Sequence, residues 1–143
     1  MKRSLSISMF LLLASLMLGC KSYTEKLTDS VTRAKETVAL GSMRTIVIAE
    51  QTYAASNEGV FASFEQLVDE GYLSSQFDHE KPKMGGYILT LTVSGKNEAP
   101  TYSINADPEP PLQGRHFFTD SNANLTRVNL TQPAGPSDPI MTE

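Results

Sequence analysis

The chain has 143 residues, with 12 Lys and Arg against 16 Asp and Glu, a single Cys and no Trp. This length predicts one domain, because it cannot supply two independent hydrophobic cores. The net charge of −4 argues against nucleic acid binding, and one Cys excludes both a disulfide framework and any zinc site that needs several thiolates.

The first 19 residues have the parts of a secretory signal peptide in the usual order. Lys2 and Arg3 form a positive start, and an apolar run follows at Ile7–Leu18. The uncharged stretch, residues 4–19, has 16 residues and would be about 24 Å long as a helix. Because a membrane-spanning helix needs about 20 residues, a cleaved signal peptide fits better than a permanent span.

Cys20 follows directly after Leu16-Met17-Leu18-Gly19, and this segment resembles the lipobox of bacterial lipoproteins. The resemblance implies cleavage between Gly19 and Cys20, attachment of a diacylglycerol to the Cys20 thiol, and acylation of the new amine by a fatty acid such as palmitate. Two or three acyl chains anchor a protein stably, whereas a single chain is marginal. The alternative is an ordinary signal peptide with an incidental Cys near its cleavage site.

The mature chain would be acidic, since the leader takes Lys2 and Arg3 with it and leaves 10 basic and 16 acidic side chains. Anionic headgroups would repel such a body, so the acyl chains alone would hold it at the membrane. Lys21 stands where an Asp would signal retention at the inner membrane in enterobacterial lipoproteins. We therefore expect a protein of the bacterial cell envelope that faces the periplasm or the exterior, at the outer rather than the inner membrane.

Residues 24–56 have the pattern of one long helix. Apolar residues recur at steps of three and four and would therefore share one side of the helix. These residues are Leu27, Val31, Ala34, Val38, Ile46, Ala49 and Tyr53. Gly41-Ser42 interrupts the pattern and predicts a kink or a point of close packing. Asn57-Glu58-Gly59 predicts the end of the helix. We expect its second half, from Met43 to Ala55, to pack on the rest of the domain.

The remaining residues predict a short helix and an antiparallel sheet. Ser63 and Gln66 form a capping-box pattern, Gly71 ends the short helix, and residues 74–86 are expected to be a loop. Alternating patterns and turn residues predict four strands, at Tyr87–Val93, Tyr102–Ala106, Arg115–Thr119 and Leu125–Leu130. Residues 131–143 have three Pro and little apolar content, which predicts a disordered tail.

The expected fold class is α+β, with the second half of a long N-terminal helix covering one face of an antiparallel sheet of three or four strands. The expected divisions of the chain are a signal peptide at 1–19, a lipid-anchored segment with the first half of the helix at 20–37, a globular domain at 38–130, and a flexible tail at 131–143.

Several local segments and their order resemble the type IV pilin superfamily, in particular the major pseudopilins of type II secretion. The segments that carry this resemblance are Gly41–Ile46, Ala49–Tyr53, Gly86–Tyr87, Tyr102–Pro108 and Gly114–Asp120. Together they extend over most of the mature domain. The resemblance implies a pilin-like globular domain.

The start of the chain departs from that family. Pilins carry a Gly-Phe-Thr-Leu-x-Glu-type cleavage motif followed by about 20 apolar residues that stay in the mature filament. This leader has no acidic residue and ends in a lipobox, so cleavage before Cys20 would remove its apolar segment. Filament subunits associate by burying that segment at about 25 cal/mol per Å² of apolar surface. We therefore expect a pilin-type head held by lipid and unable to polymerise by the usual route.

The sequence predicts no catalytic set, and we expect no enzyme activity. His79 lies in a charged run and His116 on a strand, with no Cys nucleophile and no Gly-x-Ser-x-Gly turn. Asp120, Asn122 and Asn124 have the alternate spacing that opens a calcium loop, although Leu125 and Thr131 replace the Gly and Glu of that pattern. Because some pseudopilins bind calcium near the C-terminus, the resemblance adds Asp107 and Glu109 as candidate ligands. The alternative is an Asx-type turn between strands.

Two functions remain open. The leading hypothesis is a non-enzymatic, lipid-anchored envelope protein that serves as a binding or accessory component of a secretion or pilus-like system. Its partners would be the membrane, through Cys20, and other pilin-like or secretion proteins, with no nucleic acid. Its working surface would be the sheet and the loop at 107–114, since loops on a rigid scaffold tend to carry recognition. The alternative is a true pilin or pseudopilin filament subunit with an N-terminal membrane helix.

Overall fold

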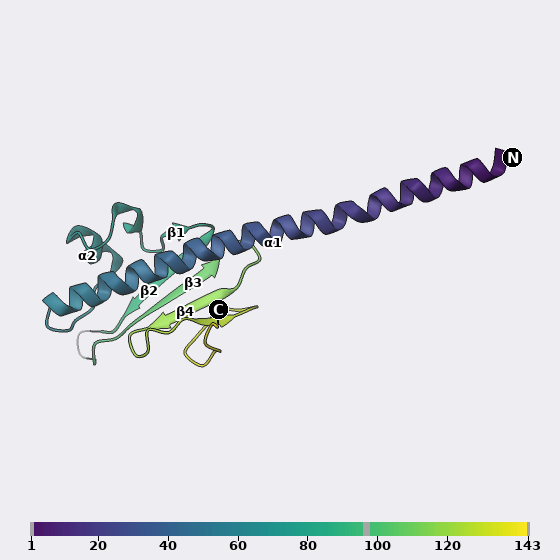
Figure 1. Cartoon of the computed structure of the whole chain (residues 1–143). Coiled ribbons are helices and arrows are strands. Elements are labelled where there is room, and N and C mark those ends of the chain that lie inside the picture. Colours follow the sequence, from purple (N-terminus) through teal and green to yellow (C-terminus); the bar gives the residue numbers. More distant parts are fainter. Residues whose placement is uncertain (1, 96–97, 143) are drawn as a thin grey trace. The chain divides into compact units, whose positions relative to one another are not determined.

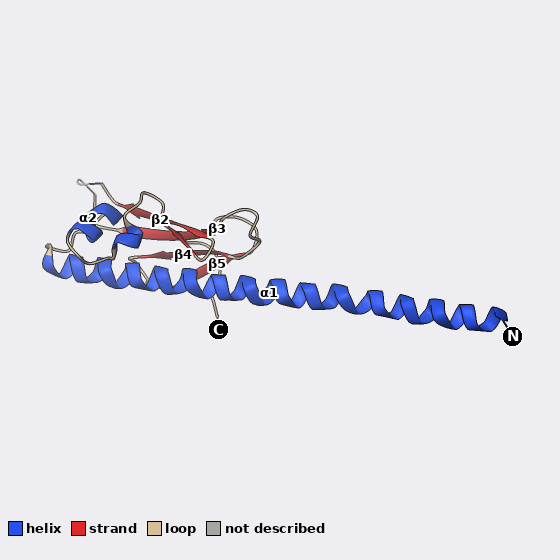
Figure 2. Cartoon of the chain, turned by 90° about the horizontal axis from the view of Figure 1, so that it is seen from above, coloured by secondary structure: helices blue, strands red, loops and turns tan. Residues whose placement is uncertain are grey.

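The computed structural model describes the backbone of residues 2–95 and 98–142, and the side chains of residues 25–95 and 98–142. Figures 1 and 2 show its elements, which are α1 Lys2–Ser56, α2 Phe64–Asp69, the 3-10 turn η1 Ser75–Phe77, β1 Lys83–Met84, β2 Tyr87–Val93, β3 Tyr102–Pro108, β4 His116–Asp120 and β5 Arg127–Asn129. The chain divides into two compact units, residues 1–33 and residues 34–143. The first unit is part of helix α1, and the second contains all the other elements.

The sheet is an antiparallel meander in the order β1-β2-β3-β4-β5. It has five strands where the sequence predicted three or four, because the segment at 74–86 is not simply a loop: it holds η1 and the short strand β1. Gly85 and Gly86 join β1 to β2 with φ values of +60° and +81°, a left-handed backbone that favours glycine. Phe77 of η1 is buried, which the polar sequence around it did not indicate.

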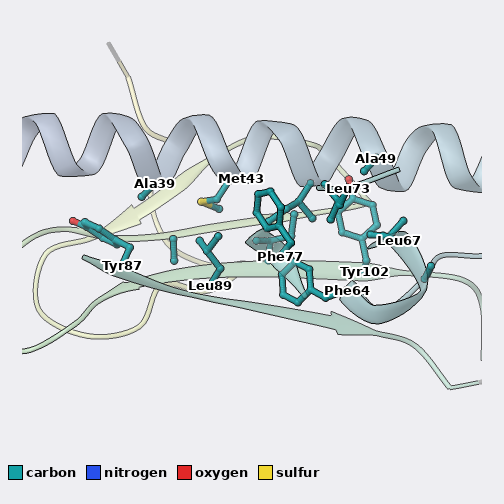
Figure 3. Close-up of a cluster of buried hydrophobic side chains, with 14 of the residues drawn as sticks. Ala39, Met43, Ala49, Phe64, Leu67, Leu73, Phe77, Tyr87, Leu89 and Tyr102 are labelled. Carbon is teal, nitrogen blue, oxygen red and sulfur yellow. The ribbon is translucent and has the colours of Figure 1, made fainter. Parts of the chain in front are cut away.

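Within residues 34–143, the second half of α1 covers one face of this sheet, as predicted. Figure 3 shows Ala39 and Met43 pointing from the helix toward Tyr87 and Leu89 of β2. Further along the helix, Ile46, Ala49 and Tyr53 belong to the same core, with Leu67, Leu73, Phe77, Tyr102, Ile104 and Phe117. Sheet residues that face the helix alternate along each strand, as Tyr87 and Leu89 do on β2.

The side of α1 that is buried differs in part from the prediction. Ile46, Ala49 and Tyr53 are buried as expected, and Leu27, Val31 and Val38, which precede the half that was expected to pack, are about half exposed, at 48%, 49% and 50%. The buried positions before Ile46 are instead Glu36, Ala39 and Met43. The apolar pattern alone did not predict that these three residues are buried, because one of them is a carboxylate and another is a small Ala.

Gly41 was expected to mark a kink or a close approach. Helix α1 instead continues through Gly41 without a break. A Cβ built on Gly41 would meet no atom within 4 Å, so nothing packs closely there. The expectation of close packing is therefore wrong.

The helix ends follow the sequence signals. The helix α1 ends at Ser56, and Glu58 and Gly59 take positive φ values of 56° and 81°. Ser63 and Gln66 cap α2 reciprocally, with each side chain bonded to the backbone of the other residue. Helix α2 ends at Asp69, and Gly71 takes a φ of 79°. The capping box and the stop signals at Gly59 and Gly71 are thus confirmed.

The C-terminal segment, expected to be a disordered tail at 131–143, is instead packed on the sheet in its described part, 131–142. The Val128 N–H donates to the Pro139 carbonyl at 3.0 Å, and the Met141 N–H donates to the Thr126 carbonyl at 2.8 Å. Ala134 is buried. Backbone and amide groups hold this segment, so its low apolar content did not reveal that it folds.

Candidate functional site

The predicted lipidation site lies outside the described side chains. The signal peptide at 1–19, its cleavage point after Gly19, and the Cys20 thiol all belong to the part of α1 for which only backbone is described. Within residues 25–95 and 98–142, whose side chains are described, no helix is long and apolar enough to cross a membrane.

The five candidate calcium ligands do not form one site. Ser103 pairs with Asp120 at one end of the β3–β4 ladder, while Asp107 lies four residues further along β3. At about 3.3 Å per residue, this places Asp107 about 13 Å from the end that carries Asp120. Within residues 25–95 and 98–142, no group of three or more His, Cys, Asp or Glu side chains is arranged to hold a metal ion.

The candidate ligands have protein partners instead. Asp120 Oδ1 accepts from the N–H groups of Asn122 and Ala123 at 3.1 and 3.2 Å, which is the Asx-type turn given as the alternative. Asn124 Oδ1 accepts from the Tyr102 hydroxyl at 2.8 Å. These contacts close the β4–β5 turn.

At the other end, Asp107 contacts His116 across β3 and β4, with 2.6 Å between Oδ1 and Nδ1, and Glu109 pairs with Lys83. The Asp107–His116 pair joins the neighbouring strands β3 and β4 on the sheet face that points away from α1, whereas the Glu109–Lys83 pair joins the residue after β3 to β1. His116 thus lies on a strand surface, as predicted, and His79 is exposed in the loop after η1.

A buried carboxylate fixes the end of the 107–114 loop to α1. Glu36 accepts from the Arg115 backbone N–H at 3.0 Å, and from its Nε and Nη2 at 3.2 and 2.8 Å. The Tyr87 hydroxyl donates to the Arg115 carbonyl at 3.0 Å. The hydrogen bonds to Glu36 raise the pKa of Arg115 above its ordinary value. The sequence did not indicate this contact, because only the apolar residues of the helix were expected to face the sheet.

A second carboxyl group on the same helix is buried without such a partner. Glu50 Oε2 accepts from the Ala62 N–H at 3.0 Å, and its Oε1 has no hydrogen-bond partner among the described residues. Burial raises the pKa of Glu50 to about 7, against the opposing effect of the Ala62 hydrogen bond. Burial raises the pKa of Tyr53 and Tyr102, and the charge of Glu50 adds to both shifts.

The C-terminal segment covers part of the surface that the sequence assigned to binding. The Asn105 amide, on the sheet face away from α1, donates to the Ala134 carbonyl at 2.8 Å. Phe118, which pairs with Asn105, is only 7% exposed although it points away from the helix. The chain itself therefore occupies this face over β3 and β4, and the free part of the sheet lies toward β2.

A groove of about 400 Å³ lies beside β2. Phe64 of α2 and Leu91 of β2 contribute its apolar lining, and its acidic lining comes from Glu65, Asp78 and Glu80. The sequence did not indicate this groove, because its lining comes from three separate segments of the chain.

Comparisons of the chain with protein-family models, curated proteins and solved structures found no match.

Proposed function

We propose that the chain is a non-enzymatic envelope protein in which a pilin-like domain, held at the membrane by lipid on Cys20, binds other proteins of a secretion or pilus-like system. The observation that supports this most directly is the packing of α1 from Ala39 to Tyr53 across one face of an antiparallel meander. A long helix covering a sheet in this way is the arrangement that the resemblance to pilins implies.

The segment after Cys20 supports a tether rather than a filament core. Residues 21–38 carry Lys21, Glu25, Lys26, Asp29, Arg33, Lys35 and Glu36. Filament subunits of the pilin type associate by burying an apolar helix against its neighbours, and charged side chains make that burial costly. A mature chain that begins at Cys20 would have no apolar helix for this purpose.

The second candidate, a filament subunit with an N-terminal membrane helix, is favoured by one observation. Helix α1 begins at Lys2, so the leader is helical. A leader retained as a membrane segment would need to be helical.

Mass measurement of the first peptide of the mature protein decides between the two. The tethered protein is expected to begin at an acylated Cys20. Cys20→Ser is expected to prevent this maturation and to change how the protein distributes between the membrane and soluble fractions. A mature chain that retains residues 1–19 and is recovered in a purified filament would refute the proposal.

Crosslinking in cells tests the partner class. Capture of pilin-like or secretion proteins by the wild-type chain, at its native level, would support the role in such a system. Capture of none of these would count against it, whatever the state of Cys20.

A further inference from the structure

The two edges of the sheet differ in how they are covered. On the β5 side, the C-terminal segment pairs with the edge strand, through the Arg127–Ile140 bridge and two backbone hydrogen bonds. On the other side, β1 pairs only with Tyr87 and Ile88 at the start of β2. An uncovered edge strand can accept another chain, and folded proteins usually protect it.

The open stretch of this edge is Leu91–Val93. The Leu89 N–H donates to the Pro82 carbonyl at 2.8 Å, which is the last backbone hydrogen bond on the β1 side of β2. Because backbone groups alternate in direction along a strand, Leu91 and Val93 point their N–H and C=O groups to the same side as Leu89. Neither N–H has a partner in the described part of the chain.

The groove lies beside this open edge. The segment before β1 lies along β2 only as far as the contact between Pro82 and Leu89. Asp78 and Glu80, earlier in that segment, line the groove together with Leu91. Glu65 adds a third carboxylate, Ser63 and His79 complete the polar lining, and no Lys or Arg among the described side chains lines the groove. Phe64 and Leu91 give it an apolar lining.

We propose that the β2 edge at Leu91–Val93, with the groove beside it, is a docking site for an extended, Lys- or Arg-bearing segment of a partner protein that adds to the sheet as a strand. The backbone groups of Leu91 and Val93 would pair with the segment, which is the strand-addition mode of peptide recognition. The three carboxylates favour a basic segment over an acidic one. This inference rests on the proposed binding role, but not on the lipid anchor.

The test uses the full chain, purified in detergent, and two capped decapeptides, one of alternating Lys and Val and one of alternating Glu and Val. We expect the Lys peptide to bind with an affinity that falls as salt is raised, and to slow hydrogen exchange at the Leu91 and Val93 amides. The Glu peptide is expected to bind at least about tenfold more weakly.

Two variants separate the site from general charge attraction. Glu65→Lys with Glu80→Lys is expected to weaken Lys-peptide binding by about tenfold or more, while Glu25→Lys with Asp29→Lys, the same charge change on α1, leaves it unchanged. Val93→Pro removes an edge N–H and is expected to weaken binding, with Val93→Ala as its control. Thermal melts of each variant identify any that fail to fold.

Three results would overturn the inference. These are no binding of the Lys peptide to the wild-type chain, binding without added protection at Leu91 and Val93, and equal binding of the Glu peptide. None of these results bears on the identity of the mature N-terminus or on partner capture in cells. The docking site can therefore be refuted while the proposed function stands.

Discussion

Two buried glutamates lie on the sheet-facing side of α1, and their surroundings differ. Glu36 is 5% exposed and accepts three hydrogen bonds from Arg115. Glu50 is fully buried and accepts one, from the Ala62 N–H, while its second oxygen has no partner among the described residues. The same residue type therefore serves as a paired anchor near one end of the packed face and as an isolated acid near the other.

Burial therefore has opposite consequences for the two carboxyl groups. A paired carboxylate keeps its charge, because the guanidinium and the backbone N–H replace water. An isolated carboxyl group in the core favours its neutral form, and burial raises the pKa of Glu50 to about 7. Stability should thus depend on Glu36 through its partner, and on Glu50 through pH.

Removal of the partner at the paired end is expected to have the largest effect. Arg115→Ala would leave the Glu36 carboxylate buried without its guanidinium, and the free energy of unfolding should fall by about 3 kcal/mol. Urea denaturation at neutral pH measures this loss. Arg44→Ala, which truncates an exposed arginine of α1, the helix that carries Glu36, is the matched control and should change stability by less than about 0.5 kcal/mol. Equal effects of the two substitutions would contradict the anchor.

At the isolated end, the charge of Glu50 should lower the stability of the fold, whereas the charge of Glu36 supports it. The folded pKa of Glu50 lies above its ordinary value of 4.5, so the folded state holds the proton more tightly. The contribution of Glu50 to stability should therefore be most favourable below pH 4.5 and fall as the pH rises toward 7. Its full loss, about 2–3 kcal/mol from this group, should be reached above pH 7.

Glu50→Gln tests that sign, because it keeps the shape and removes the titration. The variant should be more stable than the wild type at pH 8 and lose this part of the pH dependence in urea titrations. Glu36→Gln is the control, and it should destabilise the protein at pH 8, since it weakens an ion pair. If Glu50→Gln destabilised the protein as much as Glu36→Gln at pH 8, the two ends would not differ as described.

The sequence was sufficient for the elements whose signals are local. The capping box of Ser63 and Gln66, the stop at Gly59, and the alternation in Tyr87–Val93 each depend on a few neighbouring residues, and the structure has them in place. The α+β class and the helix-on-sheet arrangement followed from these elements and from the apolar residues after Met43.

The features it missed depend on contacts between distant segments. Glu36 and Arg115 are 79 residues apart, and a carboxylate on a helix is normally placed on the solvent side. The C-terminal segment packs through hydrogen bonds from Asn105 and Arg127, which composition does not reveal. The groove beside β2 combines α2, the loop after η1 and a strand, so no single stretch of sequence carries its pattern.

At the paired end, Gly114 should matter because of the Tyr87 hydroxyl. A Cβ built on Gly114 would lie 2.2 Å from the Tyr87 hydroxyl oxygen, and Tyr87 is fully buried. Gly114→Ala is therefore expected to cost about 1–2 kcal/mol. Tyr87→Phe removes that oxygen together with its hydrogen bond to Arg115, at a cost of about 1 kcal/mol. In a double-mutant cycle, Gly114→Ala should cost less in the Tyr87→Phe background, and strict additivity would contradict the close approach.

The smallest effect is expected between the two ends, on the exposed side of α1. Gly41 lies in the helix with open space around its Cβ position, so Gly41→Ala should raise the free energy of unfolding by about 0.5–1 kcal/mol by lowering the entropy of the unfolded chain. Gly59→Ala is the contrasting substitution: its Cβ also meets no atom within 4 Å, but its φ of +81° disfavours any side chain, so it should destabilise. Because Gly41→Ala touches neither glutamate, its gain should be the same at pH 5 and pH 8, whereas the effect of Glu50→Gln should grow with pH. If the gain from Gly41→Ala changed with pH, the helix would couple its two ends. The description of Glu36 and Glu50 as independent sites would then be wrong.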